Sequence, residues 1–342
     1  MLFNYKWQIA DGYPVKGVEK SNLKVFSTFA CGGGSTMGYK LAGFDVIGAN
    51  DIDPEMQKVY VENHKPKHYF LCPIGDLLTK ELPEELFNLD VLDGSPPCST
   101  FSMAGLRDKA WKIKKKFKEG QAEQVLSDLF FDFIALADRL QPKVIIAENV
   151  KGMLMGNAKA YTREVLKAFD DIGYQTQLFL LDASFMGVPQ RRKRVFFICT
   201  RKDLKMPKMS LSFNEPQIIV EELEKQCKTS QGKKVSKVYY DLWRNTPLGK
   251  SLSYSHPKGS FFNSMRVHPK HVLPTIASTE AGAFIHYSNP NLLSDEMIVL
   301  GGSFPTDYNF LKVKPRYLVG MSVPPVMTAQ VAYQVRKQLF KI

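Results

Sequence analysis

The strongest constraint on the fold is an alternation of short apolar runs and amphipathic segments over the first two hundred residues. The apolar runs are 24–29, 44–49, 90–92, 144–147 and 195–199, and the helical patterns between them include 54–63, 127–140 and 162–170. Such an alternation predicts βαβ units and a mostly parallel sheet. Ligands of such sheets bind beyond the carboxyl ends of the strands. The polar residues that follow each strand are therefore the candidates for function.

The alternation stops near Thr200, where the composition changes. Residues 201–270 contain 14 Lys and Arg against 6 Asp and Glu, with scattered proline and glycine. A helical pattern returns at 327–340. We therefore predict a first domain over residues 1–200, a loop-rich domain over 201–310, and a C-terminal segment, 311–342, that returns to the first domain.

Charge and cysteine usage narrow the classes of protein. The chain has 46 Lys and Arg against 34 Asp and Glu, which suits a polyanionic partner such as nucleic acid but also a merely soluble basic protein. No long apolar run or secretion signal is present, so we expect a cytoplasmic protein without a membrane partner. The five cysteines form no C-x-x-C pair, which predicts no metal site and leaves room for one reactive thiol.

A glycine-rich turn and two later acids suggest a nucleoside site. The run Phe29-Ala30-Cys31-Gly32-Gly33-Gly34-Ser35 follows the first predicted strand, although such turns also serve plain packing. Asp51, about 20 residues further on at the end of the second strand, can accept hydrogen bonds from ribose hydroxyls. The third strand region ends in Gly75-Asp76-Leu77, where a carboxylate can accept from an adenine amino group. The absence of a G-x-x-x-x-G-K-[ST] sequence argues against an NTPase.

The next strand leads into a stiffened cysteine. Pro96 and Pro97 precede Cys98, and prolines restrict the backbone that carries the thiol. The segment 107–118 supplies seven Lys and Arg, and nearby positive charge favours the reactive thiolate. An inert core cysteine beside a solvated basic helix face is the alternative interpretation.

Two further elements carry charge at strand ends. Glu148 ends a buried strand, where desolvation favours the neutral carboxyl and makes it a candidate proton donor, or else a capping or ion-paired acid. Arg192 and Arg194 lie in the run 190–194 before the strand 195–199, and alternation predicts that both point to one face of that strand. Two guanidinium groups on one face suit a phosphate or a base carbonyl, although a solvated edge is also possible.

Taken in this order, the Pro-Cys, Glu-Asn-Val and Gln-Arg-Arg-Lys-Arg elements resemble those of the DNA cytosine-5 methyltransferases of bacteria and phages. The resemblance runs from about residue 25 to 339, except for 201–260, and 274–276 and 320–325 look like the last two blocks of the family. It implies a Rossmann-like α/β large domain that binds S-adenosyl-L-methionine, and a smaller loop-rich target-recognition domain over 201–310.

The resemblance assigns roles to individual residues. Cys98 matches the nucleophile, Glu148 the acid that contacts N3 and the amino group of cytosine, and Arg194, with Arg192 beside it, the arginine that holds the flipped base. The implied cofactor contacts are Phe29, Gly32, Gly34, Asp51, Ile52, Asp76, Leu77, Pro97, Leu129 and Ser322. The expected DNA contacts are Ser99, Ser102, Arg107, Lys109 and Lys112.

The chain departs from the family pattern at four positions. Cys31 replaces a glycine, which predicts a less open cofactor loop, and Asp51 is shorter than the usual glutamate. Met321 replaces an asparagine and Ser99 a glutamine. None of these changes the nucleophile or the acid, so we expect an active enzyme.

The resemblance also implies partners. We expect double-stranded DNA as the substrate of a monomer, in a restriction-modification or phage-protection context with a separately acting restriction endonuclease as a candidate partner. Three alternatives stay open: a tRNA cytosine-5 methyltransferase, an inactive DNA-binding relative, and an amino-methylating enzyme. Retention of Cys98, Glu148 and Arg194 argues against the second. The third requires an aromatic residue where Cys98 stands.

Overall fold

The computed structural model describes the chain except for residues 98–113, 116–123, 126–128, 157 and 279–282. Its contacts divide the chain into two compact units. One unit contains Tyr13–Leu181, Lys193–Ser212 and Ala329–Ile342, and the other contains Met1–Gly12, Asp182–Arg192 and Phe213–Thr328. We call them the sheet unit and the loop-rich unit. The functional domains that the sequence suggests, with boundaries at residues 200 and 310, stay a prediction.

The sheet unit is built on a sheet for which seven strands are described, in the order β3-β2-β1-β4-β7-β9-β8. The strands are β1 (Lys24–Thr28), β2 (Asp45–Asp51), β3 (His68–Leu71), β4 (Val91–Gly94), β7 (Val144–Val150), β8 (Tyr174–Asp182) and β9 (Lys193–Arg201). The pairs β1–β2, β2–β3, β1–β4 and β4–β7 are parallel. The prediction of a mostly parallel sheet is therefore confirmed.

The strand β9 departs from this pattern, because it runs antiparallel to β7. The described connection from β8 to β9 contains only a short 3-10 helix, η5 (Ala183–Phe185), so no crossover helix returns the chain to the parallel direction. The strand β8 was not anticipated from the sequence, and the third strand region was expected to end in Gly75-Asp76-Leu77, whereas β3 ends at Leu71. Both carry many half-buried positions, which blurs the apolar pattern on which the prediction depended.

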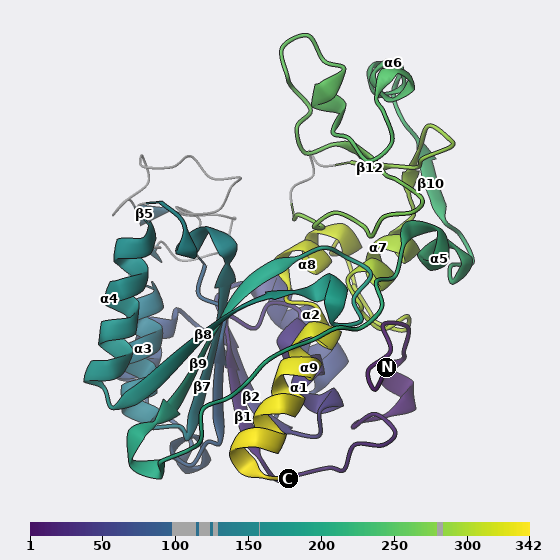
Figure 1. Cartoon of the computed structure of the whole chain (residues 1–342). Helices are drawn as coiled ribbons and strands as arrows, with labels where there is room; N and C mark the ends of the chain where they lie inside the picture. The colour runs from purple at the N-terminus through teal and green to yellow at the C-terminus, as the bar shows by residue number, and fades with distance from the viewer. Residues whose placement is uncertain (98–113, 116–123, 126–128, 157, 279–282) are drawn as a thin grey trace. The chain divides into compact units, whose positions relative to one another are not determined.

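Helices cover both faces of this sheet. Figure 1 shows α3 (Leu129–Leu140) and α4 (Ala158–Asp171) on one face, and α1 (Gly34–Leu41) and α2 (Pro54–His64) on the other. Burial of the apolar side of α3 against β1, β4 and β7 forms the main core, where Phe26, Leu92, Phe133 and Ile145 are almost inaccessible. The remaining elements here are η2 (Ile74–Leu78), η3 (Glu84–Phe87), β5 (Lys114–Lys115), β6 (Gln124–Val125), η4 (Lys151–Leu154), η6 (Lys202–Leu204) and the π-helical η8 (Arg336–Phe340).

The loop-rich unit holds a small sheet in the order β10-β13-β12-β11. Its elements are η1 (Ile9–Asp11), α5 (Val220–Lys225), β10 (Gln231–Lys234), α6 (Lys237–Asn245), η7 (Leu252–Tyr254), β11 (Met265–Arg266), β12 (Phe284–Ile285), β13 (Asn291–Leu293), α7 (Asp295–Gly301) and α8 (Pro315–Met321). A further helix, α9 (Pro325–Val335), begins in this unit and ends in the sheet unit. Trp243, Leu252 and Ile285 form a separate small core under α6 and η7. Among the described helices, none is long and apolar enough to cross a membrane.

Candidate active site

The turn from β1 to α1 adopts backbone conformations that favour glycine. Phe29 and Cys31 have φ angles of 53° and 47°, and Gly33 has a φ of 84°. The Cys31 amide donates a 2.7 Å hydrogen bond to Oδ2 of Asp51, at the end of β2. Non-glycine residues in this region are strained and are concentrated at ligand-binding turns. The protein's own contacts therefore hold this loop in one shape, with Gly32 and Gly34 in it.

His64, the last residue of α2, supports the same loop. Its Nε2 donates to the carbonyl oxygen of Gly32 at 3.0 Å, and a Cβ atom at Gly33 would lie only 2.1 Å from that nitrogen. Burial lowers the pKa of His64 to about 3, so the ring is neutral at neutral pH. This role of His64 was not predicted from the sequence. Only its position at the end of a predicted helix, close to a glycine turn, could have drawn attention to it.

Asp51 lies where the sequence places it, directly after the second strand's buried run. Its two carboxylate oxygens accept hydrogen bonds from the amides of Cys31 and Asp53, at 2.7 and 2.9 Å. Burial raises the pKa of Asp51, and these amide hydrogen bonds oppose that rise. Because a carboxylate accepts about four hydrogen bonds, Asp51 keeps capacity for hydroxyl donors. The neighbouring Ile52 is half-buried.

Asp76 and Leu77 differ from the expectation in their secondary structure. The third strand ends at Leu71, and both residues lie in η2, because the chain turns at Pro73. Asp76 is exposed, whereas Leu77 and Leu129 are buried in the main core. Both leucines therefore pack within the core of the sheet unit.

Glu148 and Arg194 form an ion pair across two neighbouring strands. Glu148 lies opposite Phe196 in the β7–β9 register, so Arg194 is its diagonal neighbour on the same face. The Arg194 Nε and Glu148 Oε1 atoms are 2.8 Å apart, and the two side chains are only 13% and 11% exposed. The structure thus brings together two residues that are 46 positions apart in the sequence.

Asn149 connects this pair to the proline segment. Its Nδ2 donates to the carbonyl oxygen of Pro96 at 3.0 Å, and the side chain is buried. Pro96 is two residues before Cys98, so Asn149 fixes the backbone that leads to the thiol. Pro97 is exposed at the end of the described segment. Asn149 belongs to the Glu-Asn-Val element, but no role for its side chain was predicted from the sequence.

A buried acid lies on β4, the strand that leads to Pro96. Asp93 of β4 accepts hydrogen bonds from Ser27 Oγ at 2.7 Å and from Tyr39 OH at 3.1 Å. Burial raises the pKa of Asp93 to about 7, with the charge of Glu148 adding to the effect and the two hydrogen bonds opposing it. The signal that was missed is an acidic residue at a fully buried strand position, Val91–Gly94.

Arg192 and Ser322 belong to the loop-rich unit. The Arg192 guanidinium donates to the carbonyl oxygens of Ile276 and Gly320, at 3.2 to 3.3 Å, and the residue is 3% exposed. Because β9 begins at Lys193, the prediction that Arg192 and Arg194 share one strand face is wrong. Arg192 instead forms hydrogen bonds with both of the last two sequence blocks, 274–276 and 320–325. Ser322 is buried at the end of α8, two residues beyond Gly320.

Several predicted residues lie outside the described part of the chain. These are the nucleophile Cys98 and the expected DNA contacts Ser99, Ser102, Arg107, Lys109 and Lys112. In the described ranges, no group of three or more His, Cys, Asp and Glu side chains could hold a metal ion.

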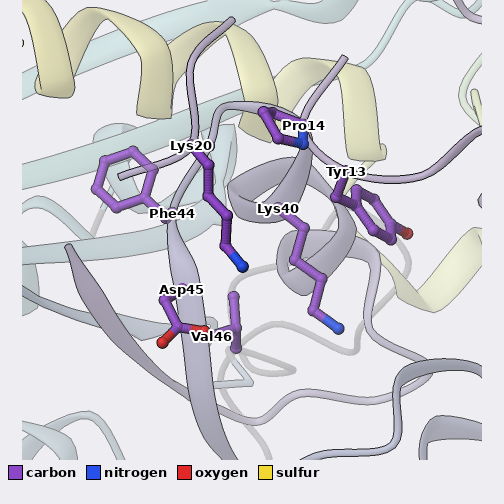
Figure 2. Close-up of a pocket in the computed structure, with 8 residues that line it drawn as sticks. Tyr13, Pro14, Lys20, Lys40, Phe44, Asp45 and Val46 are labelled. Carbon is purple, nitrogen blue, oxygen red and sulfur yellow. The ribbon is translucent and has the colours of Figure 1, made fainter. Parts of the chain in front are cut away.

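A pocket of about 190 Å³ lies at the amino end of β2. Figure 2 shows Lys20, Lys40 and Asp45 lining it, together with Tyr13 and Phe44. The ammonium of Lys40 donates to the carbonyl oxygen of His64 at 3.2 Å, so that charge already has a partner. This pocket is at the opposite end of β2 from Asp51 and takes no part in the candidate site.

The glycine turn held by Asp51, the Glu148–Arg194 pair and the Asn149–Pro96 hydrogen bond all lie in the α/β sheet unit. The C-5 cytosine-specific DNA methylase family model matches residues 23–337, and the chain belongs to this family. The chain is 34% identical over 212 residues to the type II methyltransferase M.FnuDI of Fusobacterium nucleatum, which covers 61% of this chain and 54% of that protein. It is 28% identical over 343 residues to M1.HphI of Haemophilus parahaemolyticus, covering 92% and 87%.

A solved structure shares the fold. The S. pombe Dnmt2 methyltransferase superposes with a TM-score of 0.62 at 14% identity, covering 92% of this chain and 99% of that one. At this level of identity the likeness concerns the fold alone.

The predicted fold class and family are confirmed. The alignment with M.FnuDI spans about half of that protein, 54% of its length.

Proposed function

We propose that the protein transfers the methyl group of S-adenosyl-L-methionine to C5 of a cytosine that is flipped out of a specific double-stranded DNA site. One observation carries this proposal: Glu148 on β7 pairs with Arg194 on β9, and Asn149, the residue after Glu148, holds the backbone leading to Cys98. An acid, a cation and a thiol are the groups that cytosine activation requires. Family membership supports the same reaction.

The β1–α1 turn fits the cofactor that this family uses. The turn is held in place by Asp51 and His64, the close backbone at Gly33 excludes a side chain, and Asp51 keeps free acceptor capacity. When bound, the cofactor supplies an electrophilic methyl group. The residues that would hold it are Phe29, Gly32, Gly34, Asp51, Ile52, Asp76, Leu77, Pro97, Leu129 and Ser322.

In this mechanism the Cys98 thiolate adds to C6 of the flipped cytosine, and the electrons of the 5,6 double bond make C5 nucleophilic. Glu148 shares a proton with N3 and so stabilises the charge that develops on the ring. Arg194 holds Glu148 in place through the 2.8 Å ion pair and contacts the base carbonyl. Once C5 carries the methyl group, a base removes the C5 proton, the double bond re-forms, and the thiolate leaves.

Positive charge would provide the affinity for DNA. We propose that Arg107, Lys109 and Lys112, with Ser99 and Ser102, contact the DNA beside the flipped base, and that residues 201–310 recognise the site. Flipping costs a few kcal/mol, roughly, and phosphate contacts offset this cost. Affinity should therefore fall steeply with salt concentration.

The biological setting is proposed from the names of the relatives. Several are called type II methyltransferases, which supports a modification enzyme beside a separate cognate endonuclease. We propose that it acts as a monomer. Expression in a host that lacks cytosine methylation, followed by digestion of its DNA with a panel of restriction endonucleases, would show which sites become protected.

A covalent trap tests the catalytic proposal directly. Duplex DNA that contains 5-fluorocytosine in the target site has no C5 proton to lose, so with cofactor it should form a stable adduct that survives denaturing electrophoresis. Cys98→Ala should abolish the adduct, whereas Cys227→Ala, on a half-buried cysteine of the loop-rich unit, should retain it. An adduct in Cys98→Ala, or labelling of tRNA in place of duplex DNA, would contradict the proposal.

A further inference from the structure

Positive charge is concentrated in one segment of the loop-rich unit. Residues 231–270 contain eight Lys and Arg and one acid, Asp241. Arg266 is committed to the carbonyl oxygens of Thr246 and Tyr287 and stacks on Trp243, and Lys270 pairs with Glu221. The other six are exposed and form no ion pair with any described residue: Lys233, Lys234, Lys237, Arg244, Lys250 and Lys258. Unbalanced charge of this density suits a polyanion.

A loop beside these cations is ordered by its own polar groups. In residues 251–264, Ser251 Oγ donates to the carbonyl oxygens of Phe261 and Phe262, at 3.2 and 2.8 Å. His256 Nδ1 accepts from the amides of Lys258 and Ser260, at 3.2 and 3.1 Å. These bonds close the loop on itself. Its conformation therefore does not depend on a bound partner.

The loop is also anchored to the small core. The Phe261 ring packs against Tyr239 of α6, with ring centres 5.1 Å apart, and Leu252 is fully buried. Thr246 Oγ1 donates to Ser255 Oγ at 3.0 Å, which joins the loop to the end of α6. Figure 1 shows this green segment projecting beyond β12 next to α6. The small core therefore supports the exposed side chains of the loop.

What the loop presents is aromatic. Tyr254 is 68% exposed and Phe262 is 65% exposed, which makes them the most exposed large apolar side chains in the described part of the chain. Phe262 follows directly after the anchored Phe261, so one ring holds the loop while the next points away from the core. Exposed rings in a field of unpaired cations are unfavourable in water but match the grooves and base faces of nucleic acid.

We propose that Tyr254 and Phe262 are specificity-determining residues that contact base pairs in the groove of duplex DNA, while Lys250 and Lys258 contact the flanking phosphates. This inference rests on the proposed methyltransferase function and assigns its site reading to one loop. Aromatic rings discriminate bases by contact with thymine methyl groups and by wedging at deformable steps. The preformed loop limits the ordering cost of binding.

The test compares Tyr254→Ser/Phe262→Ser with Phe87→Ala, which removes a 46% exposed ring in η3 of the sheet unit. Bisulfite sequencing of host DNA identifies the methylated sites. Fluorescence anisotropy measures binding to a duplex that contains the site methylated by the wild type. Because Tyr254 and Phe262 are largely exposed, folding of the double variant should be unaffected, and thermal melts would check this for both variants. We expect the double variant to lose affinity by about tenfold or more and to lose or relax its methylated site, with Phe87→Ala unchanged.

The two proposals can fail separately. If the wild type methylates DNA and the double variant methylates the same site with the same affinity, the loop does not read the site. If the wild type produces no 5-methylcytosine but binds duplex DNA through the two rings, the loop assignment holds and the methyltransferase function falls. Binding of tRNA in preference to duplex DNA would overturn the assignment of the loop to DNA.

Discussion

Replacing Asp93 by asparagine should remove a pH dependence from the stability of the protein. Burial raises the pKa of this carboxyl in the folded state to about 7, whereas in an unfolded chain it is about 3.9. The folded state therefore binds this proton more tightly than the unfolded state does. Stability is highest where Asp93 is protonated, falls as pH rises from about 4 to about 7, and is constant above that.

The size of the effect follows from the two pKa values. A separation of about three pH units corresponds to about 4 kcal/mol, of which about 3 kcal/mol falls between pH 5 and pH 8. Asparagine carries no charge and keeps hydrogen-bonding groups for Ser27 and Tyr39. The variant should therefore gain stability relative to the wild type by about that amount as pH rises from 5 to 8.

Urea unfolding followed by far-UV circular dichroism suits this prediction, because the sheet unit that contains Asp93 also contains the helices α1 to α4. Tyr39→Phe is the matched variant: it removes a hydrogen bond that stabilises the carboxylate and should extend the falling limb to higher pH. A difference between Asp93→Asn and the wild type that stays constant from pH 5 to 8 would refute the reasoning.

Two further predictions concern the site itself. Gly33→Ala adds a Cβ atom 2.1 Å from His64 Nε2 at a φ of 84°. The backbone conformation alone should lower the free energy of unfolding by about 1–2 kcal/mol, and calorimetry should show weaker cofactor binding. His64→Ala in the same chain should recover part of the loss, and strictly additive effects would contradict the contact. Arg194→Leu leaves Glu148 buried without its cation and should destabilise the sheet unit by about 3 kcal/mol in urea. Glu148→Gln in the Arg194→Leu background should restore part of that stability, and no recovery would argue against the pair.

Much of the architecture could be predicted from local patterns. The strands β1, β2, β4 and β7 coincide with continuous apolar runs, because a buried parallel strand needs apolar residues on both faces. The strand β8 was not predicted, and the end of β3 was misplaced, because the side chains of both strands are mostly half-buried and half-burial leaves no clear period. The antiparallel direction of β9 depends on the short η5 connection, and strand direction leaves no mark in composition.

The candidate site also contains residues that could be predicted from the sequence and contacts that could not. Asp51 and Glu148 were found because each follows an apolar run, and the order of motifs along the chain pointed to Cys98 and Arg194. The separation of Arg192 from Arg194 was not foreseen, since it depends on the carbonyl groups of Ile276 and Gly320, which come from distant segments. Alternation alone placed both arginines on one strand.

The sequence by itself determined the order of the strands along the chain, the chemical groups available and the family, because these are properties of residue type and spacing. The tertiary structure alone decided which groups meet. It placed Arg194 beside Glu148, Asn149 against Pro96 and His64 under the glycine turn, and it buried Asp93 where its charge is costly. The physical reason is that hydrogen bonds, ion pairs and desolvation depend on distances of a few ångströms, and such distances between remote residues exist only once the chain has folded.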